Sequence, residues 1–129
     1  MKRTTSMVLL LTVAAIAAPL TGGCDSETKR LARAMAGGDP DRGEAAIQTY
    51  GCASCHTIPG IRGATALVGP PLTQVGGRMY IGGVLQNTPE NMMRWIQDPP
   101  AVDAKTAMPN LHVTQPDARD IATYLYTLQ

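Results

Sequence analysis

The stretch that decides the fold is Cys52-Ala53-Ser54-Cys55-His56. A Cys-x-x-Cys-His run places two thiols about one turn apart, so that both can add to the vinyl groups of one porphyrin. The imidazole of His56 then lies beside the second thiol, where it can reach the iron from the proximal face. The run therefore predicts one haem, bound covalently through Cys52 and Cys55.

A Cys-x-x-Cys pair also occurs in thioredoxin-like redox proteins and in zinc sites. A redox pair lies at the start of a helix that follows a strand, and a structural zinc ion needs four ligands. The sequence shows no such strand before Cys52. A zinc site would have to add His112, the only other histidine, at no recognised spacing. Haem attachment is the preferred interpretation, and a redox or disulfide pair and a zinc site are the alternatives.

Residues 1–24 have the pattern of an export signal. Lys2 and Arg3 give a positive start, and the apolar run over residues 7–20 is shorter than the ~20 residues of a comfortable membrane span. The segment ends in Leu20-Thr21-Gly22-Gly23-Cys24, which resembles a bacterial lipoprotein cleavage site. This resemblance implies a lipid on Cys24 that holds an exported protein at the periplasmic side of the cytoplasmic membrane. A plain secretory signal, with Cys24 incidental, is the alternative.

Residues 25–38 are polar and small and end in Gly37-Gly38, which predicts a flexible tether. The folded domain is then expected over residues 39–129. A domain of this size buries a limited share of its surface, and this one contains no phenylalanine. An apolar cofactor would complete its interior.

Three helices are predicted, each from a capping residue and from the proline or acidic residue that follows the cap. With their caps and stops, they span residues 39–51, 88–99 and 114–128. The third has an apolar stripe formed by Ala118, Ile121, Ala122, Leu125 and Leu128. The Gly-rich residues 59–87 are expected to form loops and short turns around the cofactor, and no strand is required. The predicted fold class is all-α, with three main helices and Gly/Pro-rich loops wrapped around one haem.

Met108 is the preferred second iron ligand. It lies in an irregular stretch, residues 105–110, where a rigid turn can direct a thioether towards the iron. The remaining methionines of the mature chain are assigned to a helix or to the tether, except Met79, which with His112 is an alternative ligand. A His/Met pair fills both axial positions, and the soft thioether raises the reduction potential. Such a haem passes electrons, and oxygen or peroxide chemistry is disfavoured.

The order of the motifs resembles class I cytochrome c over residues 39–129. The motifs that carry the resemblance are Cys52 to His56, Gly69-Pro70-Pro71-Leu72, Met108-Pro109 and Tyr124-Leu125. The resemblance implies a small cytochrome c fold with His56 as the proximal ligand and Met108 as the distal ligand. It implies that the Pro70 carbonyl accepts the other imidazole N–H. It also implies that Gly43 and Ile47 on the first helix pack against Tyr124 and Leu125 on the last.

A closer similarity is to the cytochrome c domain of subunit II of some bacterial haem-copper oxidases. The matching stretches are residues 69–78, 87–91, 95–99 and 108–109. This similarity implies that Arg78 pairs with a haem propionate, with Trp95 as a second candidate. A solvated loop arginine and simple core filling are the alternative interpretations of these two residues. By analogy, the partner is a terminal oxidase or a larger respiratory membrane complex.

Charge excludes a nucleic-acid partner. The chain has 11 basic and 10 acidic residues and no basic run. Only Lys29 and Lys105 are lysines in the expected mature part, so we expect docking through a largely apolar patch around the haem edge, with weak dependence on salt. The predicted function is one-electron transfer in a bacterial respiratory chain, without enzyme activity. The alternative is a haem sensor or enzyme whose distal ligand leaves to admit a small molecule.

Overall fold

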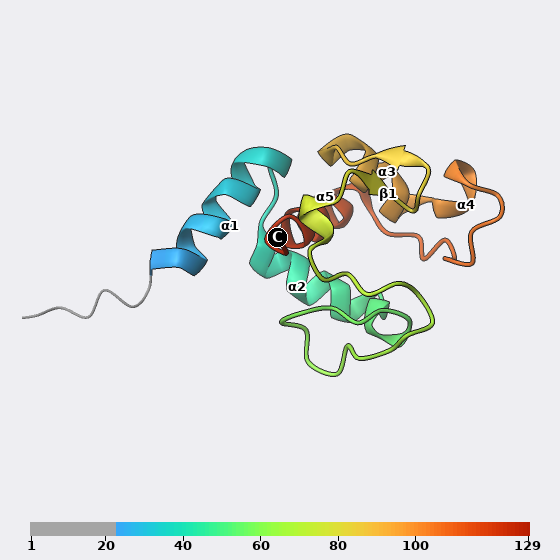
Figure 1. Cartoon of the computed structure of the whole chain (residues 1–129), viewed down its shortest axis with the longest axis horizontal. Helices are drawn as coiled ribbons and strands as arrows, with labels where there is room; N and C mark the ends of the chain where they lie inside the picture. Colours follow the sequence, from blue (N-terminus) through green and yellow to red (C-terminus); the bar gives the residue numbers. More distant parts are fainter. Residues whose placement is uncertain (1–22) are drawn as a thin grey trace, which may run out of the picture.

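A computed structural model describes residues 23–129, with the side chains described from Glu27 onwards. Figure 1 shows a mostly helical chain in which long loops join the helices. Its elements are α1 (Gly23–Ala36), α2 (Pro40–Thr49), the 3₁₀ helices η1 (Cys52–Ser54) and η2 (Val75–Gly77), β1 (Tyr80–Ile81), β2 (Leu85–Gln86), α3 (Pro89–Gln97), α4 (Pro99–Val102) and α5 (Gln115–Leu125). The all-α prediction is confirmed. The two short strands form an antiparallel hairpin within the Gly-rich loop that the sequence predicted.

The three predicted helices begin at their predicted caps. The Asp39 carboxylate accepts hydrogen bonds from two amides in the first turn of α2. Thr88 and Thr114 each accept one amide in the first turns of α3 and α5. These side chains satisfy amides that have no partner inside the helix. The Pro99-Pro100 pair ends α3 as predicted and also begins the short helix α4, because the Asp98 carboxylate accepts the Ala101 amide at 3.3 Å.

Helices α2 and α5 form the main helix pair, and they approach each other at a glycine. A Cβ atom on Gly43 would lie 2.1 Å from the Asp120 carbonyl oxygen and 3.0 Å from Cβ of Tyr124. Only glycine permits backbones to come this close. Ile47 on α2 and Leu125 on α5 are buried in the same core. The expected packing of α2 against α5 is confirmed.

The structure differs from the tether expected over residues 25–38. Most of this stretch belongs to helix α1, which packs against α5. Ala32 and Ala36 on α1 are buried in the core. An isolated helix of 14 residues is marginally stable in water. Docking onto the rest of the domain therefore stabilises α1.

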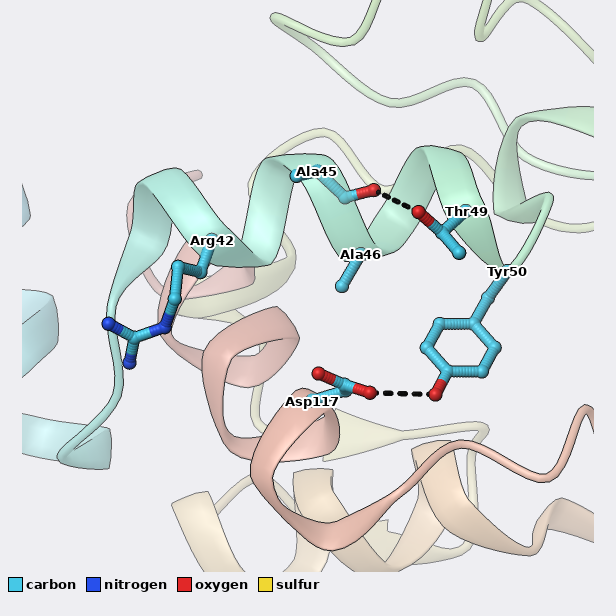
Figure 2. A pocket seen from close by; sticks show the side chains of 6 residues that line it. All are labelled: Arg42, Ala45, Ala46, Thr49, Tyr50 and Asp117. Atoms are coloured by element: carbon cyan, nitrogen blue, oxygen red, sulfur yellow. Dashed lines mark hydrogen bonds between the residues drawn. The ribbon is translucent and has the colours of Figure 1, made fainter.

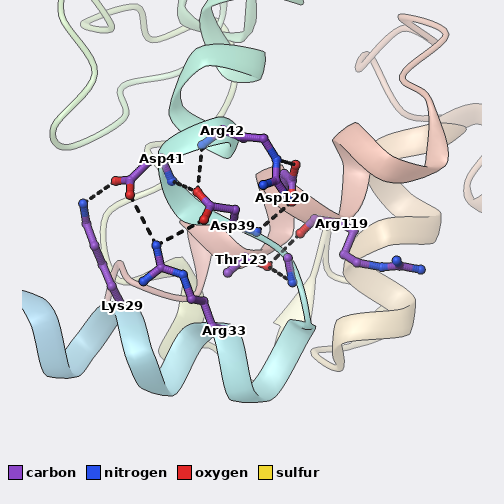
Figure 3. Close-up of polar contacts among 9 residues, drawn as sticks. Lys29, Arg33, Asp39, Asp41, Arg42, Arg119, Asp120 and Thr123 are labelled. Carbon is purple, nitrogen blue, oxygen red and sulfur yellow. Dashed lines mark hydrogen bonds and ion pairs between the residues drawn. The ribbon is translucent and has the colours of Figure 1, made fainter.

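Ion pairs complete the docking of α1, as Figure 3 shows. The Lys29 ammonium lies 2.5 Å from the Asp41 carboxylate, and Arg33 contacts both Asp39 and Asp41, at 3.2 and 3.3 Å. The two acidic residues lie at the start of α2, beyond the turn at Gly37. The ion pairs therefore join α1 to the start of the next helix. The sequence pattern of residues 25–38 alone does not show these partners, which explains why it suggested a tether.

The export-signal prediction concerns residues 1–24, of which residues 1–22 lie outside the described residues, as does the side chain of Cys24. Within residues 23–129, no helix combines the length and the apolar character needed to cross a membrane.

Two tyrosines at the end of α5 hold the two ends of the Gly-rich loop 59–87. The hydroxyl of Tyr124 donates to the Pro59 carbonyl at 2.7 Å, and the hydroxyl of Tyr126 donates to the Asn87 side-chain oxygen at 2.8 Å. Burial, and secondarily the charge of Glu90, raise the pKa of Tyr126 to about 12. Both hydroxyls therefore stay protonated at neutral pH and fix the loop to the helix.

Candidate functional site

The Cys-x-x-Cys-His run forms a tight turn directly after α2. Gly51 has φ of +72°, in the left-handed region, and this lets the chain leave the helix. The amides of Cys55 and His56 both donate to the Cys52 carbonyl, at 3.2 and 3.1 Å. Both cysteines are free thiols rather than a disulfide, and burial raises the pKa of the Cys52 thiol. The turn thus gathers two thiols and one imidazole in a single loop.

The imidazole of His56 has a fixed orientation. Its Nδ1 atom lies 2.8 Å from the Pro70 carbonyl oxygen. A carbonyl oxygen can only accept, so Nδ1 carries the hydrogen and, in the neutral ring, Nε2 keeps its lone pair. A Cβ atom on Gly69 would lie 2.5 Å from Cε1 of the ring. The peptide at Gly69 therefore lies directly against the imidazole, and Nε2 is the nitrogen available to a metal.

Further hydrogen bonds hold the loop that contains His56, residues 55–72, which we call the proximal loop. The Gly69 amide donates to the Cys55 carbonyl at 2.7 Å, and the Leu72 amide donates to the Thr57 carbonyl at 2.8 Å. The Thr57 hydroxyl donates to the Ala66 carbonyl at 2.9 Å. These bonds flank the His56–Pro70 contact on both sides. The position of the imidazole is therefore determined by backbone groups that lie far from it in sequence.

Arg78 lies exposed at the end of η2 and reaches back towards the proximal loop. Its Nη2 atom donates to the carbonyls of Pro71 and Thr73, at 2.6 and 2.8 Å. The Asn87 side chain supports the same turn by donating to the Arg78 carbonyl at 2.8 Å. Within residues 27–129, no carboxylate forms an ion pair with Arg78. The guanidinium is thus positioned by neutral groups, and its charge is available to an anion.

Trp95 on α3 packs against the β1–β2 hairpin. A Cβ atom on Gly82 would lie 2.6 Å from the Cη2 atom of the indole. Gly82 also has φ of +56°, so the turn and the close approach both require glycine. This contact is the one expected of a core-filling residue. A role for Trp95 beside the haem stays a prediction.

Met108 is half-buried and lies in an irregular stretch, residues 103–113, which we call the distal segment. Its amide donates to the Thr106 hydroxyl at 3.2 Å. The alternative ligand Met79 is 78% exposed. His112 is exposed, and across the described residues no three His, Cys, Asp or Glu side chains gather to hold a metal ion. The zinc arrangement with His112 is therefore not formed, and Met108 stays the predicted second ligand.

A hydrogen-bonded tie between α2 and α5 was not predicted. Tyr50, at the end of α2, donates its hydroxyl hydrogen to the Asp117 carboxylate at 2.7 Å. The Thr114 hydroxyl donates to the same carboxylate at 2.7 Å. The Tyr50 hydroxyl, and then the Thr114 hydroxyl, lower the pKa of Asp117. A tyrosine two residues before Cys52 was the available signal, because a partly buried tyrosine hydroxyl usually finds a partner.

The residues of the site fit a c-type haem. Two free thiols and an imidazole with one available nitrogen form one turn, and the guanidinium of Arg78 lies against the loop that holds the imidazole. The Gly-rich loop 59–87 contributes the exposed large apolar side chains Leu67, Val68, Met79, Tyr80 and Val84. Such side chains suit an apolar porphyrin or a protein partner better than water. The helical fold and this site together define the class of c-type haem proteins.

Comparison with known proteins agrees with this class. The family model described as Cytochrome c matches residues 40–129, and the chain belongs to the cytochrome c family. Membership of this family implies a haem c cofactor and electron transfer as the chemistry.

Three curated relatives are named cytochrome c oxidase subunit 2. The chain is 30% identical over 90 residues to the protein of Alkalihalophilus pseudofirmus, 30% over 88 residues to that of Bacillus sp. strain PS3, and 28% over 87 residues to that of Bacillus subtilis. The matches cover 69%, 65% and 66% of this chain. They span about a quarter of the length of each relative. No solved structure gives a significant match.

Proposed function

We propose that this protein is a one-electron carrier with one haem c, attached through Cys52 and Cys55 and ligated by Nε2 of His56 and the thioether of Met108. The observation that carries the proposal is the 2.8 Å contact of Nδ1 of His56 with the Pro70 carbonyl, beside a glycine that leaves no room for a side chain. This contact fixes both the tautomer and the orientation of the ring. When bound, the haem supplies an iron that changes reversibly between the ferrous and ferric states.

The protein side chains have separate tasks in this proposal. The backbone around Gly69 prevents rotation of the proximal imidazole. The guanidinium of Arg78 pairs with a haem propionate, and the Pro71 and Thr73 carbonyls hold it in place for that contact. Trp95 on α3 is the second candidate for this propionate contact. Ligands that scarcely move allow fast electron transfer, because little reorganisation accompanies the change of charge.

The experiment that tests this proposal compares two methionine variants of the holoprotein. Met108→Ala should lose the weak long-wavelength absorption band of thioether-bound ferric haem, and the reduced variant should bind carbon monoxide. The potential should fall by on the order of 0.1 V, because the thioether favours ferrous iron. Met79→Ala is the matched control and should resemble the wild type in all three respects. Loss of the band in Met79→Ala, with a normal Met108→Ala, would overturn the ligand assignment.

We propose that the electron acceptor is a terminal oxidase, or that the protein is the haem subunit of a larger respiratory membrane complex. The similarity to proteins named cytochrome c oxidase subunit 2 supports this proposal. Docking would use the exposed apolar side chains of loop 59–87. The rate of electron transfer to a purified oxidase should therefore change little with added salt. A steep fall in rate with salt would contradict apolar docking, and purification from intact membranes should reveal the partner.

We also propose that the protein is exported and lipid-anchored through Cys24 on the periplasmic side of the membrane. The apolar run over residues 7–20 and the sequence before Cys24 support this proposal. Mass spectrometry of the mature N-terminus should find acyl chains on Cys24. The Cys24→Ala variant should move to the soluble fraction. A mature protein that begins elsewhere and carries no lipid would contradict the proposal.

A further inference from the structure

The hydrogen bonds of the distal segment, which contains Met108, are all local. Within the part of the chain that the structure describes, its residues bond only to partners no more than four positions away. These bonds are Asp103 to Pro99, Lys105 to Asp103, Thr106 to Asp103, Met108 to Thr106, and His112 to Asn110. The apolar side chains of Leu111 and Val113 also pack on the core.

The first hydrogen bonds that join this part of the chain to a distant element come from Tyr50. The Tyr50 hydroxyl accepts the Thr114 amide at 3.4 Å and donates to Asp117 at 2.7 Å. Figure 2 shows Tyr50 reaching from the end of α2 across a cleft to Asp117 on α5. Tyr50 lies two residues before Cys52, and Thr114 directly follows the distal segment. One side chain therefore connects the haem-attachment turn, residues 52–56, to the end of the segment that contains Met108.

We infer that Tyr50 is a positioning residue that holds the distal segment against the haem-attachment turn and so controls how readily Met108 leaves the iron. This inference rests on the proposed function, in which Met108 is the distal ligand. Tyr50 touches neither ligand in this role. It acts through Thr114 and Asp117, whose positions set where the distal segment ends. The proximal ligand does not depend on Tyr50, because the backbone of the proximal loop fixes His56 directly.

Tyr124 provides a matched control for this inference. Its hydroxyl also donates one hydrogen bond of 2.7 Å, to the Pro59 carbonyl, but this bond anchors the proximal loop. Tyr50→Phe and Tyr124→Phe each remove one hydroxyl and keep the aromatic ring. A difference between the two variants at the distal ligand therefore reports the location of the hydrogen bond and not a general loss of stability.

The test is an optical titration of the ferric holoprotein with imidazole, which binds where Met108 dissociates. A hydrogen bond to a charged group corresponds to a factor of about ten in an equilibrium constant. Tyr50→Phe should therefore bind imidazole at about a tenfold lower concentration than the wild type. Tyr124→Phe should stay within about twofold of the wild type. Asp117→Asn, which keeps an acceptor oxygen but loses the charge, should lie between the wild type and Tyr50→Phe and serves if Tyr50→Phe fails to fold.

Hydrogen exchange gives a readout that does not depend on the iron. The hydrogen-bonded amides of Met108 and His112 should exchange about tenfold faster in Tyr50→Phe, and those of Gly69 and Leu72 should be unchanged. Equal imidazole affinity in the wild type and Tyr50→Phe, or an equal shift in Tyr124→Phe, would overturn the inference while Met108 ligation stands. A wild-type protein without the thioether band would overturn the proposed ligand set and this inference together.

Discussion

The proximal loop and the distal segment contain the two proposed iron ligands, and they are anchored differently. Around His56, the hydrogen bonds described above join residues 9 to 15 positions apart and include the imidazole itself. Around Met108, each hydrogen bond stays within four positions of the chain, among the residues that the structure describes. The proximal ligand is therefore fixed by its own loop. The distal ligand depends on Tyr50, a residue outside its segment.

The largest effect is expected where the proximal loop is tightest. In Gly69→Ala, the new methyl group would lie 2.5 Å from the His56 ring, so the loop or the ring must shift. We expect the holoprotein to lose about 2–3 kcal/mol of unfolding free energy in urea. Gly77→Ala is the matched control, because nothing lies within 4 Å of the place that its methyl group would take, and it should change stability by less than about 0.5 kcal/mol. Equal unfolding free energies for the two variants would show that the proximal loop is not packed tightly around His56.

The next largest effect is expected at Tyr124, which anchors the proximal loop, whereas Tyr50 anchors the distal segment. Tyr124→Phe removes the bond to Pro59 and should lower the unfolding free energy by about 1 kcal/mol. The thioether band should be retained, because the distal segment is untouched. Tyr80→Phe, in which the hydroxyl of an exposed ring is removed, should have no measurable effect on stability. Loss of Met108 ligation in Tyr124→Phe would show that the proximal loop and the distal segment are not anchored independently.

A smaller effect is the pH dependence of stability that comes from Asp117 on α5, which is hydrogen-bonded to Tyr50. Hydrogen bonds from Tyr50 and Thr114 lower the pKa of Asp117 below its ordinary value of 3.8. A carboxylate with a lowered pKa stabilises the folded state above the ordinary pKa, and this contribution is lost as the pH falls through the folded value. The free energy of unfolding of the wild type should therefore fall more steeply below about pH 4 than that of Asp117→Asn. Asp117→Asn has no carboxylate to titrate at this position, so an equal fall in the two proteins would contradict the contribution of the Tyr50–Asp117 hydrogen bond.

The smallest effect is expected at α1, away from both sides. Asp41→Asn removes the pairs with Lys29 and Arg33, which are largely exposed. Exposed ion pairs contribute about 0–1 kcal/mol and weaken with salt. We expect a slightly lower unfolding free energy at low salt that vanishes at high salt, with unchanged imidazole affinity. A change in imidazole affinity in Asp41→Asn would show that α1, and not Tyr50 alone, affects Met108.

The parts of the fold that the sequence predicted are those with local signals. The helix starts at Asp39, Thr88 and Thr114 follow from a side chain and the two or three residues after it. The contact of His56 with the Pro70 carbonyl followed from a resemblance to known proteins rather than from the residues alone. The adjacent residue is a glycine because a side chain on Gly69 would occupy the space of the His56 ring.

The parts that the sequence did not predict depend on partners far apart in the chain. Tyr50 and Asp117 are 67 residues apart, and no periodicity connects them. Helix α1 resembled a tether because its stabilising partners, Asp39 and Asp41, lie beyond a glycine turn. In both cases each residue alone has an ordinary interpretation as a surface or capping residue. Only the packing of α1, α2 and α5 brings the partners together.

The central claim is that a covalent haem, held through Cys52, Cys55 and His56, completes this domain. The most direct measurement is the mass and colour of the purified holoprotein after extraction with acid acetone. We predict that one haem stays with the chain and that Cys52→Ala with Cys55→Ala releases it. A colourless protein, or pigment that the solvent removes from the wild type, would contradict the claim.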